Sequence, residues 1–254
     1  MPDLFGSAAM AAGYARARPP LHARIVEMAW RRLGRTEAVE RALDVGCGSG
    51  LSTAPLRRIA RHCLGLDPNA AMVRWAGVTA PGAVFAAAAA EALPVASHSI
   101  DLITAAGSLN YADPDRAFPE AVRVLRPGGA LVVYDFSQGR SFAGSPDLDR
   151  WFEEFRRRYP APRGDARTLD PAILAGLATG LDPGESDHFE IGLPLTPEFY
   201  VDYAMTETNV ALAVANGTPA AEIRAWCEAS VAAAFRGETR EVRFRGYWAC
   251  LLRN

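Results

Sequence analysis

Short apolar runs alternate with amphipathic stretches along most of this chain. The apolar runs at residues 41–45, 63–67, 100–106 and 129–136 have the length and composition of strands buried on both faces. The amphipathic stretches between them are typical of helices that cover a sheet. Helices are expected at residues 22–33, from the glycines near 50 to about 62, from 69 onwards, and at 115–125, 147–159, 171–181, 197–214 and 219–235. This alternation predicts a doubly wound α/β sheet.

The first of these strands leads into a glycine-rich turn at residues 43–50, which read LDVGCGSG, and the second strand ends in Asp67. A turn and a carboxylate in these places predict a nucleotide-type ligand at the carboxyl edge of the sheet. The fingerprint of dinucleotide-binding proteins needs a third glycine at position 51, where this chain has Leu51. Asp44 would also repel a pyrophosphate. The pattern therefore favours a ligand that carries an ammonium group and no phosphate.

In these residues the chain resembles the class I methyltransferases that use S-adenosylmethionine, and specifically the small-molecule enzymes similar to ubiquinone and menaquinone methyltransferases. The resemblance covers residues 38–137. It rests on segments that follow one another at the family's intervals, at residues 44–50, 67–72, 90–94, 99–103 and 125–129. It also favours a third strand at 83–90, although five consecutive alanines there have a helical propensity.

The resemblance implies a Rossmann-like sheet of seven strands whose last strand is antiparallel, with a small helical cap. The last two strands are expected at residues 189–193 and 240–252. One methyltransferase domain would span residues 1–254, with the cofactor-binding core at 38–137. A cap on the substrate side would exclude water from the reacting methyl group. The segments assigned to this cap are residues 1–36, 137–165 and 194–238.

The cofactor implied by the resemblance is S-adenosylmethionine, and the product is S-adenosylhomocysteine. Asp44 would organise the ammonium end of the cofactor, and Asp67 would bind both ribose hydroxyls. Tyr14 and Arg18 would close over the methionine carboxylate, which an arginine fork fits well. The residues implied as cofactor-binding are Tyr14, Arg18, Asp44, Gly46, Cys47, Gly48, Asp67, Pro68, Met72, Ala90, Glu91, Ala106, Ser108 and Tyr111.

One position departs from the family pattern. Ala89 stands where the family usually has an Asp or Asn that receives the adenine amino group. Adenine recognition would then fall to backbone groups, such as those of Ala90 and Glu91. The simpler alternative for the glycines is that they only permit a tight turn between a strand and a helix.

Methyl transfer is an in-line displacement at carbon, so the protein must mainly hold the acceptor close to the methyl group. A hydroxyl or protonated amine acceptor also needs a base. The candidates for catalysis are His22, Asn110, Tyr111 and Asp135, although Tyr111 could equally be a packing residue and Asp135 could cap a turn. The open alternatives are a protein that binds S-adenosylmethionine without methyl transfer, a cyclase-like relative, an RNA methyltransferase and a nicotinamide oxidoreductase.

The composition limits the classes of molecule that this protein is expected to bind. The formal net charge is −2 and the pI is about 6.1, so no basic field predicts binding to nucleic acid or to a membrane surface. The four cysteines and four histidines have no metal-ligand spacing, and every basic residue is an arginine, which excludes lysine chemistry. A small-molecule substrate and a cytoplasmic location are expected. The acceptor atom and the oligomeric state stay open.

Overall fold

The chain divides into two compact units, and the computed structural model describes residues 17–162 and 166–254 of it. The sheet unit comprises residues 20–136, 165–189 and 246–254. The helical unit comprises residues 1–19, 137–164 and 190–245. Each unit is therefore assembled from three segments that are distant in the sequence.

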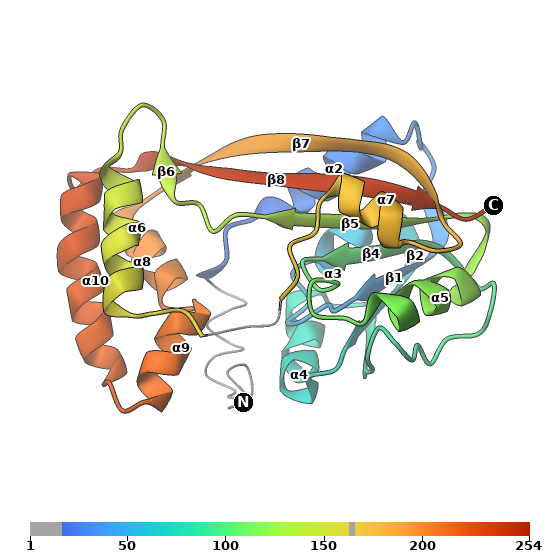
Figure 1. The fold of residues 1–254 in the computed structure, drawn as a ribbon, viewed down its shortest axis with the longest axis horizontal. Coiled ribbons are helices and arrows are strands. Elements are labelled where there is room, and N and C mark those ends of the chain that lie inside the picture. Colours follow the sequence, from blue (N-terminus) through green and yellow to red (C-terminus); the bar gives the residue numbers. More distant parts are fainter. Residues whose placement is uncertain (1–16, 163–165) are drawn as a thin grey trace. The chain divides into compact units, whose positions relative to one another are not determined.

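The eight-stranded sheet of the described residues has the strand order β3-β2-β1-β4-β5-β8-β6, and β7 also pairs with β8. The last three strands along the chain are β6 (Ser141–Phe142), β7 (Asp182–Leu195) and β8 (Arg240–Leu252). The strands from β3 to β5 are parallel, and β8 runs antiparallel to β5. Figure 1 shows β1, β2, β4 and β5 side by side. Val45 is in register with both Leu66 and Ala105, so the carboxyl ends of β1, β2 and β4 lie level with one another. The bounds in the sheet unit are β1 (Val39–Val45), β2 (Ala60–Asp67), β3 (Val84–Ala87), β4 (Ile100–Ala106) and β5 (Leu125–Phe136).

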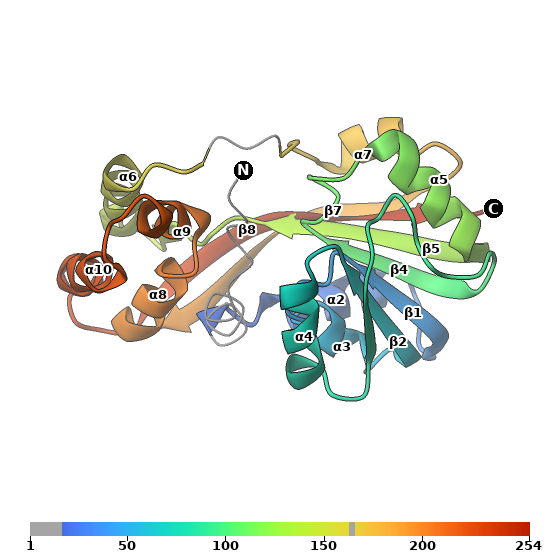
Figure 2. The same ribbon diagram turned by 90° about the horizontal axis from the view of Figure 1, so that it is seen from below.

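Helices cover both faces of this sheet (Figure 2). Helices α2 (Leu21–Arg32), α3 (Thr53–Leu56) and α4 (Ala70–Thr79) lie on one face, and α5 (Pro114–Val124) and α7 (Pro171–Leu177) lie on the other. The layer formed by α5 and α7 buries a continuous apolar core against the strands. Side chains of that core include Leu43, Ile103, Phe118, Leu131 and Leu174.

Local sequence explains where the helices next to the strand ends begin. Asn69 caps α4, because its side-chain oxygen accepts the backbone N–H groups of Ala71 and Met72. Asp113 caps α5 in the same way, and Pro114 occupies its first helical position. Asn69 comes two residues after the end of β2, and Asp113 follows the loop after β4, so both caps help to fix loops at the carboxyl edge of the sheet.

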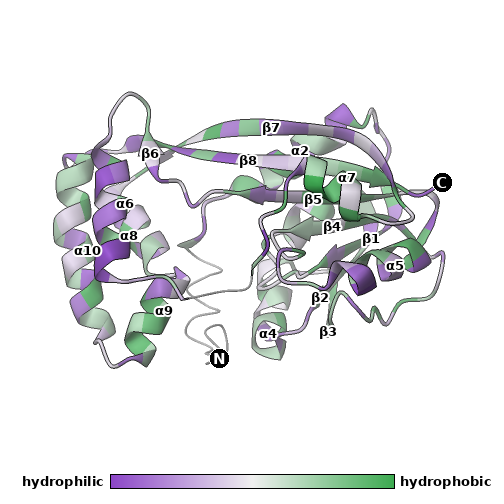
Figure 3. Ribbon diagram, viewed as in Figure 1, coloured by the Kyte–Doolittle hydropathy of each residue, from purple (hydrophilic) through white to green (hydrophobic). Residues whose placement is uncertain are grey.

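The helical unit packs its helices around aromatic side chains. Trp151, Phe155 and Trp226 stack on one another, with ring centres 5.0–6.2 Å apart. Figure 3 shows that α6 (Asp147–Arg158) is largely hydrophilic while α9 (Thr208–Ala215) is largely hydrophobic. The two helices therefore differ in how much of their surface is suited to burial. The elements of this unit are β6 (Ser141–Phe142), α6 (Asp147–Arg158), α8 (Pro197–Ala204), α9 (Thr208–Ala215) and α10 (Ala220–Phe235).

Two long strands, β7 (Asp182–Leu195) and β8 (Arg240–Leu252), belong in part to each unit. Gly184 lies against Cys250 and Gly192 lies against Glu241, so β7 and β8 run in opposite directions. The division between the units falls after Phe189 in β7 and after Arg245 in β8.

The predicted fold class, a doubly wound sheet with an antiparallel last strand, is confirmed, and the strand at 83–90 exists as β3. The sheet has eight strands instead of seven, because the two-residue strand β6 pairs with β8. The strand predicted at 189–193 is the end of the much longer β7.

Three helix predictions were wrong in their extent. The helix predicted at 171–181 ends at Leu177. The helix after the glycine turn ends at Leu56 and not near residue 62, because Ala60 already pairs with Val39 as the first residue of β2. The helix predicted at 197–214 is broken between α8 and α9, where Glu207 has an extended backbone. Among the described residues, no helix has the length and apolar character needed to span a membrane.

Candidate cofactor site

The glycine turn lies at the carboxyl end of β1 and is shaped by close approach to its neighbours. Gly46 has a φ of 71°, and a Cβ on it would lie 2.1 Å from the Cβ of Ser108, so no larger residue fits. Ser108 in turn donates from its hydroxyl to the carbonyl oxygen of Val45 at 2.6 Å. Gly48 has a φ of 50°, and a Cβ on it would meet nothing within 4 Å. One side of the turn is therefore packed and the other side is open.

Four N–H groups of this turn, those of Gly46, Cys47, Gly48 and Gly50, are engaged inside the protein. Those of Gly46 and Cys47 donate to the carbonyl oxygen of Leu66, and that of Gly50 donates to Cys47. The N–H of Gly48 donates to the Asp67 carboxylate at 2.9 Å. A phosphate-binding loop needs such donors free for its ligand. This turn instead leaves an open surface at Gly48, beside the carboxylate of Asp67, that a ligand can approach closely.

Asp44 is completely buried in β1 and is held by hydroxyl groups. Its Oδ2 accepts hydrogen bonds of 2.6 Å from Ser52 and from Thr53, and its Oδ1 accepts one of 3.0 Å from Thr104. Burial raises the pKa of Asp44 to about 6, and the three hydroxyls oppose that rise. Asp44 thus joins the turn to the start of α3 and to β4.

Asp67 ends β2 next to the turn and is only half-buried. Besides the Gly48 N–H, its carboxylate accepts the N–H of Asn69 at 2.8 Å. Burial raises the pKa of Asp67, and these two hydrogen bonds oppose the rise. Two backbone donors leave carboxylate lone pairs available for further hydrogen bonds.

The other residues predicted around the turn differ in accessibility. Met72 is 5% exposed in the first turn of α4, whereas Pro68 is exposed. Cys47 is buried, and burial raises the pKa of its thiol, which keeps it neutral. Ala106 ends β4 in register with Tyr134. The structure therefore gathers these residues around the ends of β1, β2 and β4.

The loop after β3 lies next to Asp67, because the N–H of Ala88 donates to the carbonyl oxygen of Asp67 at 3.1 Å. Ala90 and Glu91 lie in a turn closed by the N–H of Ala92, which donates to Ala89. The Glu91 carboxylate accepts the N–H of Asp113 at 2.8 Å and so is turned to the start of α5. The Glu91 side chain is thus directed to α5, while the backbone of Ala90 and Glu91 lies in the turn.

The four candidates for catalysis lie in three different places near the ends of β4 and β5. Asn110 donates from its amide to Asp135 at 2.8 Å, and burial raises the pKa of Asp135. His22 lies 2.9 Å from the Tyr134 hydroxyl through its Nδ1 and packs edge-on against Phe136. Tyr111, by contrast, is 75% exposed.

Arg18 belongs to the helical unit and pairs there with a buried carboxylate. Its Nη1 is 3.4 Å from Oε1 of Glu207, and its Nη2 donates to the carbonyl oxygen of Thr206 at 3.4 Å. The contact of Arg18 with the methionine carboxylate stays a prediction. Tyr14 lies outside the described residues.

Sequence reasoning missed the hydroxyl partners of Asp44. Ser52 and Thr53 directly follow the glycines, and Thr104 is in register with Asp44 across β1 and β4. Hydroxyl residues right after a glycine turn were the available signal. It also missed an acid–base pair on α5, Glu120 and Arg123, whose spacing of three residues was visible in the sequence.

Comparison with known proteins agrees with this geometry. The family described as "Methyltransferase domain" matches residues 43–133. A demethylmenaquinone methyltransferase of Beutenbergia cavernae is 36% identical over 160 residues, which are 54% of this chain and 67% of that relative. A demethylmenaquinone methyltransferase of Renibacterium salmoninarum is 38% identical over 114 residues, 42% of this chain and 48% of that protein.

A solved structure shares the fold over most of its length. It is a candidate type II methyltransferase from Anaeromyxobacter dehalogenans, with a TM-score of 0.67, 23% identity, and coverage of 89% of this chain and 95% of that one. The chain spans about half the length of the first curated relatives it matches, at 48–49%. The similarity in sequence is thus concentrated in part of each protein.

Proposed function

This chain belongs to the methyltransferase family whose cofactor is S-adenosylmethionine, and we propose that it transfers the cofactor's methyl group to a small metabolite. The acceptor atom would be oxygen, nitrogen or carbon. The proposal extends to a cytoplasmic enzyme that does not act on nucleic acid, since the net charge of −2 supplies no basic field.

The observation that carries the proposal is the hydrogen bond from the Gly48 N–H to the Asp67 carboxylate. This hydrogen bond holds the Asp67 carboxylate in a place where a pyrophosphate would need a hydrogen-bond donor. It also holds the carboxylate beside the open side of the turn. The residues present fit S-adenosylmethionine: a ribose can donate two hydroxyl hydrogen bonds to Asp67, and the methionine part can lie over Gly48.

Asp44 would act on the ligand indirectly. Since all three of its hydroxyl contacts lie within the fold, its role would be to hold the turn and to supply negative charge behind it. A cationic ammonium group near the turn would favour the ionised form of Asp44.

Bound S-adenosylmethionine supplies an electrophilic methyl group on a positively charged sulfur. The protein's task is then to hold the acceptor in line with that methyl group and to exclude water. Where the acceptor is a hydroxyl or protonated amine, Asp135 would take the proton. Burial raises the pKa of Asp135, which makes its carboxylate a stronger base than an exposed one, and Asn110 would hold its orientation.

Calorimetric titration with S-adenosylhomocysteine, with NADH as the parallel ligand, tests the cofactor. We expect micromolar binding of the first and no binding of the second. Binding of NADH alone would overturn the proposal. Acceptors can then be screened by following the conversion of S-adenosylmethionine to S-adenosylhomocysteine.

Asp135→Asn tests the base once an acceptor is found. With a hydroxyl or amine acceptor, kcat/KM should fall by about 100-fold while S-adenosylhomocysteine affinity stays unchanged. An unchanged kcat/KM would remove Asp135 from the chemistry.

A further inference from the structure

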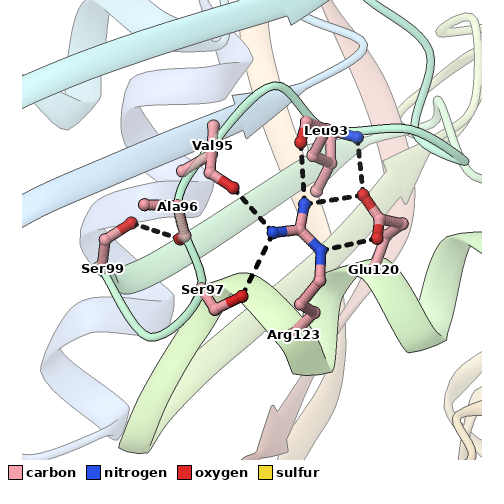
Figure 4. Close-up of polar contacts among 7 residues, drawn as sticks. All are labelled: Leu93, Val95, Ala96, Ser97, Ser99, Glu120 and Arg123. Carbon is pink, nitrogen blue, oxygen red and sulfur yellow. Dashed lines mark hydrogen bonds and ion pairs between the residues drawn. The ribbon is translucent and has the colours of Figure 1, made fainter.

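The loop that follows β3 is fixed to helix α5 by two charged side chains, Glu120 and Arg123. Arg123 donates from Nη1 to the carbonyl oxygen of Val95 and from Nη2 to that of Leu93, both at 2.8 Å (Figure 4). Glu120 accepts the N–H of Leu93 at 2.7 Å. Both backbone groups of Leu93 are therefore held by one acid–base pair.

The pair itself is rigidly built. Nε and Nη2 of Arg123 donate to the two carboxylate oxygens of Glu120 at 2.7 and 2.8 Å, which is the bidentate geometry of a strong arginine–carboxylate pair. The pairing with Arg123 also lowers the pKa of Glu120, so the carboxylate is charged at neutral pH. Nη1 of Arg123 additionally reaches the Ser97 hydroxyl at 3.4 Å, as Figure 4 shows. We call Glu120 and Arg123 the α5 clamp.

The α5 clamp fixes one end of a short stretch whose other end is fixed at Asp67. The Ala88 N–H donates to the Asp67 carbonyl oxygen, and the Leu93 side chain is buried in the core at 5% exposure. Residues 89–92 lie between these two anchors. The clamp therefore helps to set the position of their backbone relative to the Asp67 carboxylate.

The backbone of residues 89–92 matters because their side chains offer few polar groups that could bind adenine. Three of them are alanines, and the carboxylate of Glu91 is engaged by the N–H of Asp113. Since the Glu91 side chain is directed to α5, recognition of adenine here would rely on backbone N–H and C=O groups. Such groups distinguish adenine from hypoxanthine only when they are held in place, since the two bases exchange a donor for an acceptor on the same edge.

From this geometry we infer that Glu120 and Arg123 are positioning residues for the adenine of the cofactor, although neither touches it. The inference rests on the proposed cofactor site. The clamp takes the place of a side chain that would bind the base directly.

The test compares the affinities of S-adenosylhomocysteine and of S-inosylhomocysteine, its hypoxanthine analogue, by calorimetry. Wild-type protein should bind the adenine compound at least about tenfold more tightly, as expected for a reversed donor–acceptor pair. Arg123→Met should lower the affinity for S-adenosylhomocysteine by about tenfold and bring the ratio of the two affinities close to one. Arg123→Lys, which can keep one of the carbonyl contacts, should give intermediate values.

Glu120→Gln provides a second variant that keeps the shape of the side chain, in case Arg123→Met does not fold. Arg116→Met is the matched control, because Arg116 is an exposed arginine on the same helix. It should change neither affinity.

The outcomes separate this inference from the proposed function. Wild-type protein that binds neither compound would overturn the cofactor site itself. If wild type binds S-adenosylhomocysteine without discrimination, or if the clamp variants lose affinity for both compounds equally, the positioning role is wrong. A ratio that falls in Arg123→Met and Glu120→Gln but not in Arg116→Met would support it.

Discussion

Each unit of this protein buries a carboxylate, and the two are stabilised in different ways. Asp44 in the sheet unit has no exposed surface and receives three hydrogen bonds from neutral hydroxyls. Glu207 in the helical unit is 8% exposed and faces Arg18 at 3.4 Å, and its Oε1 has that ion pair but no hydrogen bond among the described residues. Burial raises the pKa of both groups.

The difference lies in how far the partners are from the carboxylate in the sequence. Two of the three groups that hold Asp44 follow it within nine residues, and the third is on an adjacent strand. Glu207 depends on charged residues from remote segments, Arg18 and Arg140, which oppose the rise in its pKa. A motif can therefore encode the first arrangement, while only the complete fold of the helical unit produces the second.

The largest expected effect concerns the ion pair of the helical unit. Glu207→Ala should lower the free energy of unfolding by about 3–5 kcal/mol, because it removes the buried carboxylate that faces the partly buried Arg18 and offsets the charge of Arg140. Urea unfolding followed by tryptophan fluorescence measures this, since Trp151 and Trp226 lie in the same unit. Glu153→Ala, at an exposed position of α6, should change stability by less than about 0.5 kcal/mol. Equal effects of the two substitutions would contradict the importance of the pair.

The next effect concerns binding in the sheet unit. Asp67→Ala should weaken S-adenosylhomocysteine binding by about 1–3 kcal/mol through the loss of charged hydrogen bonds to the ribose. Calorimetry is the measurement, and Asp115→Ala, at an exposed position in the same unit, is the control. Unchanged affinity in Asp67→Ala would remove this residue from the site.

The open side of the glycine turn gives a smaller effect on stability. Gly48→Ala puts a side chain at a φ of 50° and should cost about 1 kcal/mol of folding free energy. It should also lower S-adenosylhomocysteine affinity about tenfold, because the methyl group occupies the surface on which the ligand would lie. Gly77→Ala in α4, where a Cβ also meets nothing within 4 Å, should leave binding intact and stabilise the helix. If Gly48→Ala binds normally, the ligand does not lie against this face.

The smallest expected effect is a pH dependence that belongs to Asp44. Its pKa is raised from 3.8 to about 6 in the folded protein, so its contribution to stability is complete below pH 3.8 and is lost as the pH rises through 6. Wild-type protein without ligand should lose about 1 kcal/mol more stability than Asp44→Asn between pH 5 and pH 7.5. Parallel pH profiles of the two proteins, measured by urea unfolding, would show that Asp44 keeps an ordinary pKa.

The sheet unit could be predicted to a large extent because its information is local. Strands buried on both faces are apolar runs, and β4 and β8 have the predicted bounds. Asp44, Asp67 and the glycines could be identified because a turn at a strand end restricts residue type. The short α3 could not be foreseen, since its end is set by pairing of Ala60 with Val39 and not by its own residues.

The helical unit was less predictable because its packing decides where helices stop. The break between α8 and α9 comes where Glu207 turns inward to meet Arg18, and the local apolar pattern continues across it. The α5 clamp illustrates a similar limit. Glu120 and Arg123 read as an ordinary surface pair, and only the structure shows that they hold the backbone of Leu93 and Val95.

The division of β7 and β8 between the units has a consequence for how such a protein can change by recombination. Because the units are joined within continuous strands at Phe189 and at Arg245, neither can be exchanged between relatives by a single crossover at a linker. A chimera that replaces the helical unit must exchange three segments together and keep the hydrogen-bonding register of both strands. We therefore expect the helical unit to diversify in this lineage by point changes and loop insertions, and not by shuffling of a whole module.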